Sequence, residues 1–251
     1  PEPFVVKVVD IIGTIDAILQ PSRLKDGTPN GLQVPGPAEI DRLVTGVSPS
    51  VDLFERAAEL DAGLVLCHHG LFWGATMGLS PIELARLRVL LRHDIAFAAY
   101  HLPLDAHPEI GNNALLAGLL GCERHEEFGD VGRLATFGAG GIEIAELLAR
   151  VERACGRVPL RQGRGPERVE RLGIVSGGAA SMLRDAVEAG CDAFLTGEPK
   201  ENVMGDATDS GIHFIAAGHY ATETFGIRRL GDLIAERHGV EHVFVDLPNP
   251  V

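Results

Sequence analysis

The chain repeats itself, and this internal repeat restricts the fold more than any other feature of the sequence. Residues 42–48 read RLVTGVS, and residues 171–177 read RLGIVSG. Each segment is followed by a stretch rich in Ala and Glu, and then by Asp-Ala and a second apolar run, at 61–67 and 192–196. Two matching successions of strand and helix predict two similar α/β halves related by a pseudo-dyad.

Apolar runs between amphipathic stretches define the expected elements. We expect strands at 42–47, 63–67, 95–100, 134–137, 172–175, 193–196, 212–217 and 242–246. We expect the longest helices at 4–19, 142–154 and 222–238, and a loop rich in Pro and Gly at 21–37. This alternation predicts mostly parallel sheets covered by helices. Because no long linker is present, the expected halves, 1–127 and 128–251, should pack closely.

The composition restricts the functional class. The net charge of −13 argues against a general nucleic-acid binder, because few Lys and Arg are available to neutralise phosphates. The four cysteines are scattered and form no C-x-x-C pair, which favours a reduced, cytoplasmic setting. We identify no signal peptide, and no segment reaches the roughly 20 apolar residues of a membrane helix.

Three of the expected strands end in side chains that bind metals. His68 and His69 follow the strand at 63–67, and Gly70 breaks the strand so that both rings can turn to one side. The strand at 95–100 leads into His101 and Asp105, and the strand at 212–217 leads into His219 and Glu223. Ligands collect beyond the carboxyl ends of strands in open α/β sheets. We therefore expect these side chains to converge.

This set of donors is sufficient for two divalent metal ions. One helical turn separates His219 from Glu223, so both side chains can face the same way. Glu223 has two oxygens with which to bridge two metals, although a carboxylate at a helix start is also favoured by the helix dipole. Pro103 places Asp105 in a loop rather than in a regular helix. Imidazole and carboxylate ligands without thiolate are compatible with iron, zinc, manganese or nickel.

Other residues have two readings each. His101 is either a ligand or a supporting donor and general acid/base. Glu198 is either a base or substrate anchor, or only an acid at a helix start. The turn at 176–178 either cradles a phosphate or is merely a turn. Trp73 either lines the mouth of a pocket or packs in the core. We assign His101 and Glu198 as the candidate catalytic residues and predict no organic cofactor.

Several short motifs resemble those of one known family. They are His-His-Gly at 68–70, His-Leu-Pro-Leu-Asp-Ala-His-Pro at 101–108 with Gly-Asn-Asn behind it, Thr-Gly-Glu at 196–198 and Gly-His-Tyr-Ala-Thr-Glu at 218–223. In this order they resemble the NIF-three-like family, whose members are also labelled homologues of type 2 GTP cyclohydrolase I. The resemblance runs from Asn30 to Pro250, and the chain looks like the short bacterial form of the family.

The resemblance implies two intertwined α/β halves and a toroidal homohexamer with metal pairs that face an internal cavity. It implies a dinuclear centre whose ligands fall on His68, His69, Asp105, His219 and Glu223, with Glu223 as the bridge. All five are present in the chain. Tyr220 stands where close relatives can have His, a change at the rim that removes no ligand.

Two classes of function fit these observations. The first is a metal-dependent hydrolase that acts on a nucleotide or a related small molecule, with His101 or Glu198 moving protons. Opening of a purine imidazole ring, the cyclohydrolase step, is one such reaction, and a phosphoesterase or amidohydrolase fits as well. The second is a metal carrier, an insertion factor or an interaction scaffold without catalytic activity.

Overall fold

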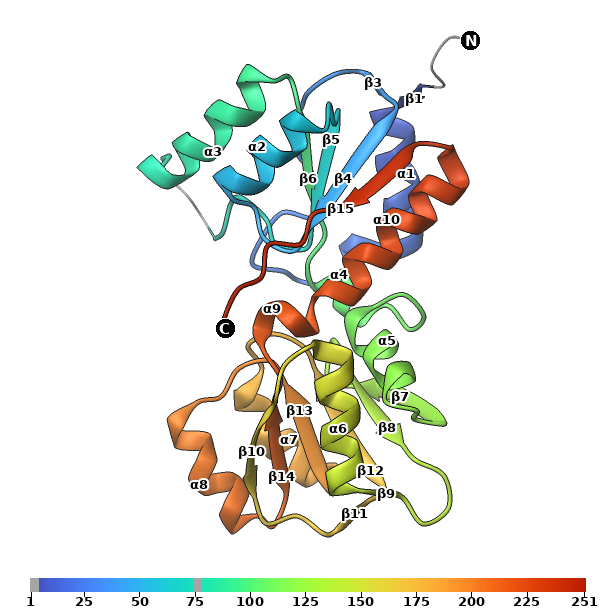
Figure 1. The fold of residues 1–251 in the computed structure, drawn as a ribbon, viewed down its shortest axis with the longest axis vertical. Helices are drawn as coiled ribbons and strands as arrows, with labels where there is room; N and C mark the ends of the chain where they lie inside the picture. The colour runs from blue at the N-terminus through green and yellow to red at the C-terminus, as the bar shows by residue number, and fades with distance from the viewer. Residues whose placement is uncertain (1–4, 75–77) are drawn as a thin grey trace. The chain divides into compact units, whose positions relative to one another are not determined.

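The structure is a computed structural model that describes residues 5–74 and 78–251 (Figure 1). It contains two compact units. Unit 1 comprises the described residues up to Leu104 together with Gly226–Leu247, and unit 2 comprises Asp105–Phe225 together with Pro248–Val251. The chain therefore passes from unit 1 to unit 2 directly before Asp105, and it returns three residues after Glu223.

Unit 1 is built on a five-stranded sheet in the order β15-β4-β5-β6-β2. The strands are β2 (Gly31–Val34), β4 (Arg42–Gly46), β5 (Leu64–Cys67), β6 (Ala96–Ala99) and β15 (Glu241–Phe244). All pairings are parallel except that of β2 with β6. Every residue of β5 and β6 is buried, as expected for central strands of a sheet that is covered on both faces.

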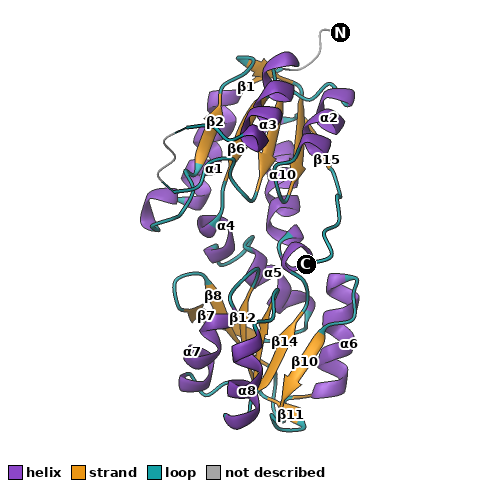
Figure 2. Cartoon of the chain, turned by 90° about the vertical axis from the view of Figure 1, so that its left-hand side faces the viewer, coloured by secondary structure: helices purple, strands orange, loops and turns teal. Residues whose placement is uncertain are grey.

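Helices cover both faces of this sheet (Figures 1 and 2). They are α1 (Val8–Leu19), α2 (Val51–Glu59), α3 (Pro81–Arg92) and α10 (Thr224–His238). Phe54 of α2 and Leu90 of α3 pack with Phe97 of β6 in one apolar cluster. The helix α3 begins with a capping box, in which Ser80 and Glu83 satisfy each other's backbone N–H groups.

Unit 2 contains a six-stranded sheet in the order β10-β14-β13-β12-β8-β7. Its strands are β7 (Arg124–Phe128), β8 (Gly132–Thr136), β10 (Leu160–Gly163), β12 (Arg171–Val175), β13 (Ala193–Thr196) and β14 (His213–Ala216). The central strands β12, β13 and β14 are parallel, and the outer pairings are antiparallel.

Two apolar clusters attach the helices of unit 2 to its sheet. Those helices are α5 (Asn112–Leu119), α6 (Ile144–Cys155), α7 (Leu183–Glu188) and α8 (Glu201–Asp209). One cluster joins α5 and α6 to the sheet through Leu116 and Val151, and the other joins α7 and α8 to it through Leu183 and Val203. As in unit 1, both faces of the parallel strands are covered.

The expected repeat is present in the order of the elements. In unit 1, β1 (Val6–Lys7), α1, β2, β3 (Glu39–Ile40), β4, α2, β5, α3 and β6 follow one another. In unit 2, β9 (Ile142–Glu143), α6, β10, β11 (Arg168–Val169), β12, α7, β13, α8 and β14 do the same. The antiparallel edge strand is repeated as well. In unit 1, β2 pairs antiparallel with β6, and in unit 2, β10 pairs antiparallel with β14. The α/β class with two similar halves is thus confirmed.

Two strands pair outside the expected half of the sequence in which they lie. Strand β15 lies in the second half and pairs with β4 of unit 1, and most of β7 lies in the first half and pairs with β8 of unit 2. These pairings make the halves intertwined. The compact units therefore have other boundaries than the expected halves 1–127 and 128–251, which remain a prediction about the sequence repeat.

Local structure differs from the sequence-based expectation at several places. Within the helix expected at 4–19, Val6–Lys7 form β1, and α1 begins only at Val8. The loop expected at 21–37 contains strand β2. Asp105 lies in a short helix, α4 (Leu102–Ala106), because Pro103 occupies the first turn, where its missing N–H costs nothing. The helix expected at 222–238 is divided into α9 (His219–Thr222) and α10, with Glu223 between them. Phe4, where the first helix was expected to begin, lies outside the described residues.

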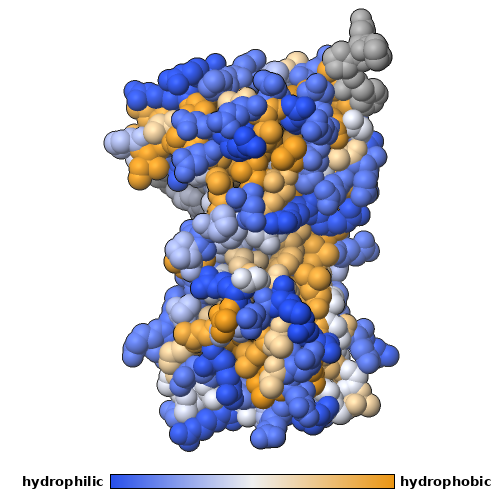
Figure 3. All heavy atoms as spheres, viewed as in Figure 1, coloured by the Kyte–Doolittle hydropathy of each residue, from blue (hydrophilic) through white to orange (hydrophobic). Residues whose placement is uncertain are grey.

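On the face drawn in Figure 3, hydrophobic residues lie among hydrophilic ones over both units. Several exposed apolar side chains belong to α3, among them Ile82 and Leu91. Within residues 5–74 and 78–251, no helix combines the length and the apolar character needed to cross a bilayer.

Candidate metal centre

The candidate ligands of unit 1 lie beyond the ends of two neighbouring parallel strands. Strands β5 and β6 pair in register, with Cys67 opposite Ala99, so both chains leave the sheet at the same edge. His68 follows β5 directly, and His101 follows β6 after Tyr100. The sheet register therefore brings together two residues that are far apart in the sequence.

The three imidazoles of unit 1 form one cluster. The ring centroid of His68 lies 4.9 Å from that of His69 and 5.1 Å from that of His101, and the last two are 5.6 Å apart. One potential ligand atom from each ring lies within 4.8 Å of the others. His68 is fully buried, and its two neighbours are partly exposed. This geometry meets the expectation that both rings of the His pair turn to one side.

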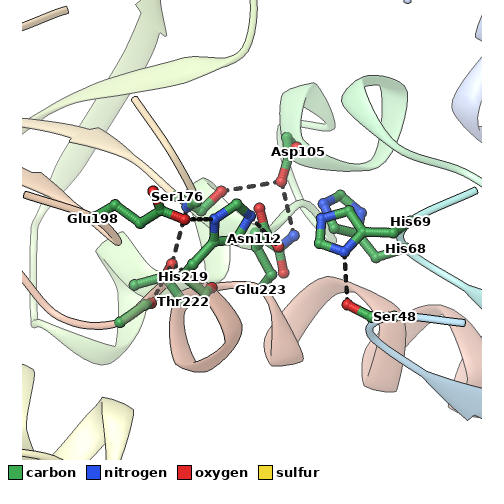
Figure 4. Close-up of polar contacts among 12 residues, drawn as sticks. Ser48, His68, His69, Asp105, Asn112, Ser176, Glu198, His219, Thr222 and Glu223 are labelled. Carbon is green, nitrogen blue, oxygen red and sulfur yellow. Dashed lines mark hydrogen bonds and ion pairs between the residues drawn. The ribbon is translucent and has the colours of Figure 1, made fainter. Parts of the chain in front are cut away.

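Each ring of this cluster is held at its Nδ1 atom. His68 Nδ1 donates to the backbone oxygen of Tyr100 at 3.1 Å. His69 Nδ1 lies 2.8 Å from Ser48 Oγ (Figure 4). His101 Nδ1 lies 2.8 Å from Oδ1 of Asp26. Histidines that bind metals commonly use one ring nitrogen in this way, which fixes the tautomer and leaves Nε2 for the ion.

The carboxyl group of Asp26, which accepts a hydrogen bond from His101, is ionised. Burial by itself raises the pKa of this carboxyl group, but the hydrogen bonds from His101, Asn30 and the Leu102 N–H, with the nearby charge of His101, lower it further than burial raises it. The net effect is a pKa well below the usual range. The carboxylate form, which accepts the hydrogen bond from His101, is thus the form present at neutral pH.

In unit 2, His219 lies between two carboxylates. Its Nδ1 donates a short hydrogen bond to Oε1 of Glu198, and its Nε2 lies 3.2 Å from Oε2 of Glu223 (Figure 4). Burial lowers the pKa of His219, but both carboxylates favour the charged ring and together raise this pKa to about 9. The same ring thus faces Glu223 with one nitrogen while Glu198 fixes the other.

Glu223 is buried at the break between two helices, with 3% of the residue exposed. Its backbone N–H donates to Tyr220 O at 3.1 Å, which ends α9 before α10 begins. Gly177 passes close to the carboxylate: a Cβ atom at this position would lie 2.2 Å from Oε1 of Glu223 and 3.1 Å from Nε2 of His219. The absence of a side chain at Gly177 therefore makes room for both groups.

Asp105 is also buried, and two neighbours hold one of its oxygens. Asn112 Nδ2 donates to Oδ1 at 2.8 Å, and Ser176 Oγ donates to the same oxygen at 3.0 Å. Asn113 braces this arrangement, because its side chain contacts the backbone of Ser176 and of Val131 at 2.7 and 2.9 Å. These contacts orient the carboxylate of Asp105.

The carboxylates of Asp105 and Glu223 approach each other within unit 2. One oxygen of each lies within 4.8 Å of the other, and both residues are buried. Two buried carboxylates at this distance repel each other, and a divalent cation would compensate both charges. The donor set thus fits a metal on chemical grounds, with oxygen ligands and an imidazole side by side.

The structure brings the expected residues together in two groups. His68, His69 and His101 cluster in unit 1, and Asp105, Glu198, His219 and Glu223 cluster in unit 2. The convergence of the two groups on one point remains a prediction. Sequence reasoning missed the side chains that hold the ligands, Ser48, Asp26, Asn112 and Asn113. The two Asn lie in the Gly-Asn-Asn motif of the family resemblance, but neither they nor the Asp-Gly pair in the loop had a role assigned, because such residues are common turn and cap signals.

The structure favours one of the two interpretations given above for the turn at 176–178 and for Trp73. At the turn that begins with Ser176, the N–H of that residue donates to Asn113 and the N–H of Gly177 donates to Thr222, which favours a structural turn over a phosphate cradle. Trp73 is 44% exposed and lies 5.1 Å from the ring of His101, which favours a place at the edge of the imidazole cluster over the core.

Comparison with known proteins identifies the family of this chain. The family model described as Duf34/NIF3 (NGG1p interacting factor 3) matches residues 6–250. A protein of Pseudomonas aeruginosa named GTP cyclohydrolase 1 type 2 homolog is 42% identical over 245 residues, which covers 96% of this chain and 97% of that protein.

Solved structures with the same fold are similar over nearly the whole chain. The protein ybgI, described as of unknown function, has a TM-score of 0.93 at 39% identity, with 98% of this chain and all of that chain covered. TTHA1606 from Thermus thermophilus has a TM-score of 0.91 at 32% identity, with the same coverage. With a match of this extent and order of motifs, the chain belongs to the Duf34/NIF3 family.

Proposed function

We propose that the protein binds two divalent metal ions and is a metal-dependent hydrolase of a nucleotide or a related small molecule. The observation that carries the proposal is that the candidate ligand side chains are already held in place. Every imidazole of the candidate set has its Nδ1 held by another group, and both carboxylates are buried. Groups held in this way are oriented before a ligand arrives, as metal sites require.

The course of the chain supports a single centre. Asp105 is the first residue of unit 2, and Glu223 lies three residues before the chain returns to unit 1 at Gly226. His101 precedes the first crossing by four residues. Because the candidate ligands flank both crossings, we infer that the two groups of ligands belong to one dinuclear centre. Its ligands are His68, His69, Asp105, His219 and Glu223.

The surroundings of Glu223, Asp105 and Glu198 indicate the role of each residue in the proposed centre. Glu223 has two oxygens and a buried position, which suit a bridge between two ions. Asp105 is buried and has its Oδ1 oriented by Asn112 and Ser176, and we assign it the role of a monodentate ligand. The hydrogen bond from His219 to Glu198 favours an orienting role for Glu198 over the role of base. When bound, a pair of such metals lowers the pKa of a coordinated water and polarises an oxygen of a substrate.

The substrate class rests on a stacking surface and on the names of relatives. Trp73 is partly exposed beside His69 and His101, where its ring is suited to stack against a planar base. The relatives bear the name GTP cyclohydrolase 1 type 2 homolog, and GTP is a purine nucleotide. A purine nucleotide is therefore the first substrate to test.

The metal content tests the centre. Purified protein loaded with Zn²⁺, Mn²⁺ or Fe²⁺ should bind two ions per chain, measured by elemental analysis after removal of free metal. His68→Ala and Glu223→Ala should lower the content to one ion or none, whereas His93→Ala, an exposed histidine at the end of α3, should leave it at two. Unchanged content in both ligand variants would contradict the proposed centre.

Turnover tests the reaction. Loaded protein should hydrolyse at least one member of a panel of nucleotides, esters and amides, and the same two ligand variants should abolish the activity. Inactivity across the panel with two tightly bound ions would instead support a metal carrier or insertion factor.

The assembly and the compartment are further parts of the proposal. By resemblance to the family, we expect six copies to form a ring in the cytoplasm. Light scattering coupled to size exclusion should then give about six times the chain mass of 26.7 kDa. A monomer or dimer at micromolar concentration would contradict the ring.

A further inference from the structure

His101 lies beside the two imidazoles that the proposed centre uses, yet it is not one of the five ligands named above. We propose that Nε2 of His101 is a further metal ligand and that Asp26 is the positioning residue that presents it. This inference rests on the proposed metal centre. It assigns to His101 a direct bond to the ion instead of the transfer of protons.

The loop before β2 holds both the ring and the backbone of His101. Asp26 Oδ1 accepts from His101 Nδ1 at 2.8 Å, and Asp26 Oδ2 accepts from the Leu102 N–H at 3.0 Å. Asn30 Oδ1 accepts from the His101 N–H at 2.8 Å, and Asn30 Nδ2 donates to Asp26 at 3.0 Å. The side chain of Asp26 is 4% exposed. Such a closed set of contacts fixes one ring orientation.

The fixed orientation leaves Nε2 as the atom directed at the other two histidines. Nδ1 is engaged in all three rings, by Asp26, by Ser48 and by the backbone of Tyr100. One nitrogen of each ring lies within 4.8 Å of the other two. Three imidazoles and an open position form a ligand set that catalytic zinc sites use, with Zn–N bonds of about 2.0–2.1 Å.

A carboxylate paired with a histidine also occurs in general bases, so the surroundings of the ring decide between the two roles. The ring of His101 faces two other imidazoles and the edge of Trp73, at centroid distances between 5.1 and 5.6 Å. If the three rings bind one cation together, the close approach of His68 and His69 to His101 is explained. Proton transfer requires none of the imidazoles to lie so close.

The repeat gives a second, independent argument. Strands β6 and β14 occupy equivalent places in the two sheets, and the histidines that follow them are His101 and His219. Both rings have a carboxylate at Nδ1, from Asp26 in one case and from Glu198 in the other. The two carboxylates come from different loops, so the same arrangement has been built twice from different residues. A ligand role for His219 thus extends to its counterpart.

Affinity for Zn²⁺ provides the first test, with competition against a chromophoric chelator as the measurement. His101→Ala should weaken one of the two sites at least 100-fold, and Asp26→Asn should weaken the same site about 10- to 100-fold, the usual effect of removing a carboxylate behind a ligand. His93→Ala is the matched control and should leave both affinities unchanged. Cooperative unfolding of each metal-free variant establishes that it is folded.

Two further measurements separate a ligand from a structural residue. The visible absorption of the Co²⁺-loaded protein should change in His101→Ala, because a nitrogen ligand is lost. In His101→Gly, millimolar imidazole should restore both the spectrum and the affinity, since free imidazole can occupy the vacated position. A residue with only a structural role would allow neither effect.

The outcomes distinguish this inference from the function it rests on. If His101→Ala keeps both Zn²⁺ affinities and the Co²⁺ spectrum of the native protein while His68→Ala loses them, His101 is not a ligand and the proposed centre stands. If the native protein binds no Zn²⁺ or Co²⁺, the centre and this inference both fail.

Discussion

Nδ1 of His219 donates a hydrogen bond to the carboxylate of Glu198, while Nε2 of the same ring lies 3.2 Å from Oε2 of Glu223. Because Glu198 accepts from Nδ1, Nε2 is the ring nitrogen that faces Glu223. In the proposed centre, Glu198 would therefore act on the metal through His219 without binding the ion itself.

Glu198→Gln should therefore weaken metal binding without unfolding the protein. The amide keeps the size of the side chain but removes its charge, so the ring is a poorer donor to the ion. We expect the affinity of one site to fall about 10- to 100-fold. Isothermal titration with Zn²⁺ measures it. Glu201→Gln changes an exposed Glu at the start of α8 and should leave the affinity as it is; an equal loss in this control would contradict the prediction.

Asn113→Ala should destabilise unit 2. The Asn113 side chain is fully buried and contacts the backbone of Asp105, Val131 and Ser176 at 3.4, 2.9 and 2.7 Å. Its removal leaves buried backbone groups without these contacts, at a cost of about 2–4 kcal/mol. Urea unfolding measures this loss. Asn202→Ala, at an exposed position of α8, should change the free energy of unfolding by less than about 0.5 kcal/mol.

The sequence predicted the parts of the fold that depend on strong local patterns. The apolar runs before His68, His101 and His219 form parallel strands, and the repeat predicted the matching order of elements in both units. What failed depends on tertiary context. Strand β2 is short and lies in a segment rich in Pro and Gly, and only its pairing with β6 makes it a strand.

The candidate site shows the same division. Each proposed ligand lies shortly after the carboxyl end of β5, β6 or β14, so its type and position in the sequence identify it. Glu198 was also identified from its motif, but Asp26, Ser48 and Ser176, which orient other ligands, carry no such signal because their partners are remote in sequence. Asp26 and His101 are 75 residues apart, and Ser176 and Asp105 are 71 apart. Only the folded chain joins them.

The ionised state of Asp26 gives a prediction about acid. Its pKa is lower in the folded protein than the ordinary value near 4, so the folded state is favoured while the carboxyl is ionised. This contribution is present above about pH 4 and is lost as the pH falls below it. Asp26→Asn should lower the free energy of unfolding by about 2 kcal/mol at pH 7 and at pH 5.

Urea unfolding at several pH values checks this dependence. The difference between native protein and Asp26→Asn should shrink between pH 4 and pH 3, where the native carboxyl begins to lose its advantage. A difference that stays constant down to pH 3, or that grows, would show that the charge of Asp26 does not stabilise the fold.

Gly177→Ala should damage the metal site more than any other substitution by a single methyl group in this turn. The backbone of Gly177 has a φ of +67°, which a residue with a side chain adopts at a cost of about 1 kcal/mol. The new Cβ would also lie 2.2 Å from Oε1 of Glu223, so this carboxylate must move. We expect loss of at least one metal ion per chain, with cooperative unfolding retained, by elemental analysis and calorimetry. Gly178→Ala is the matched control, because its Cβ would lie no closer than 3.7 Å to Glu198 or His219. Equal metal content in the two variants would show that the space beside Glu223 is not needed for binding.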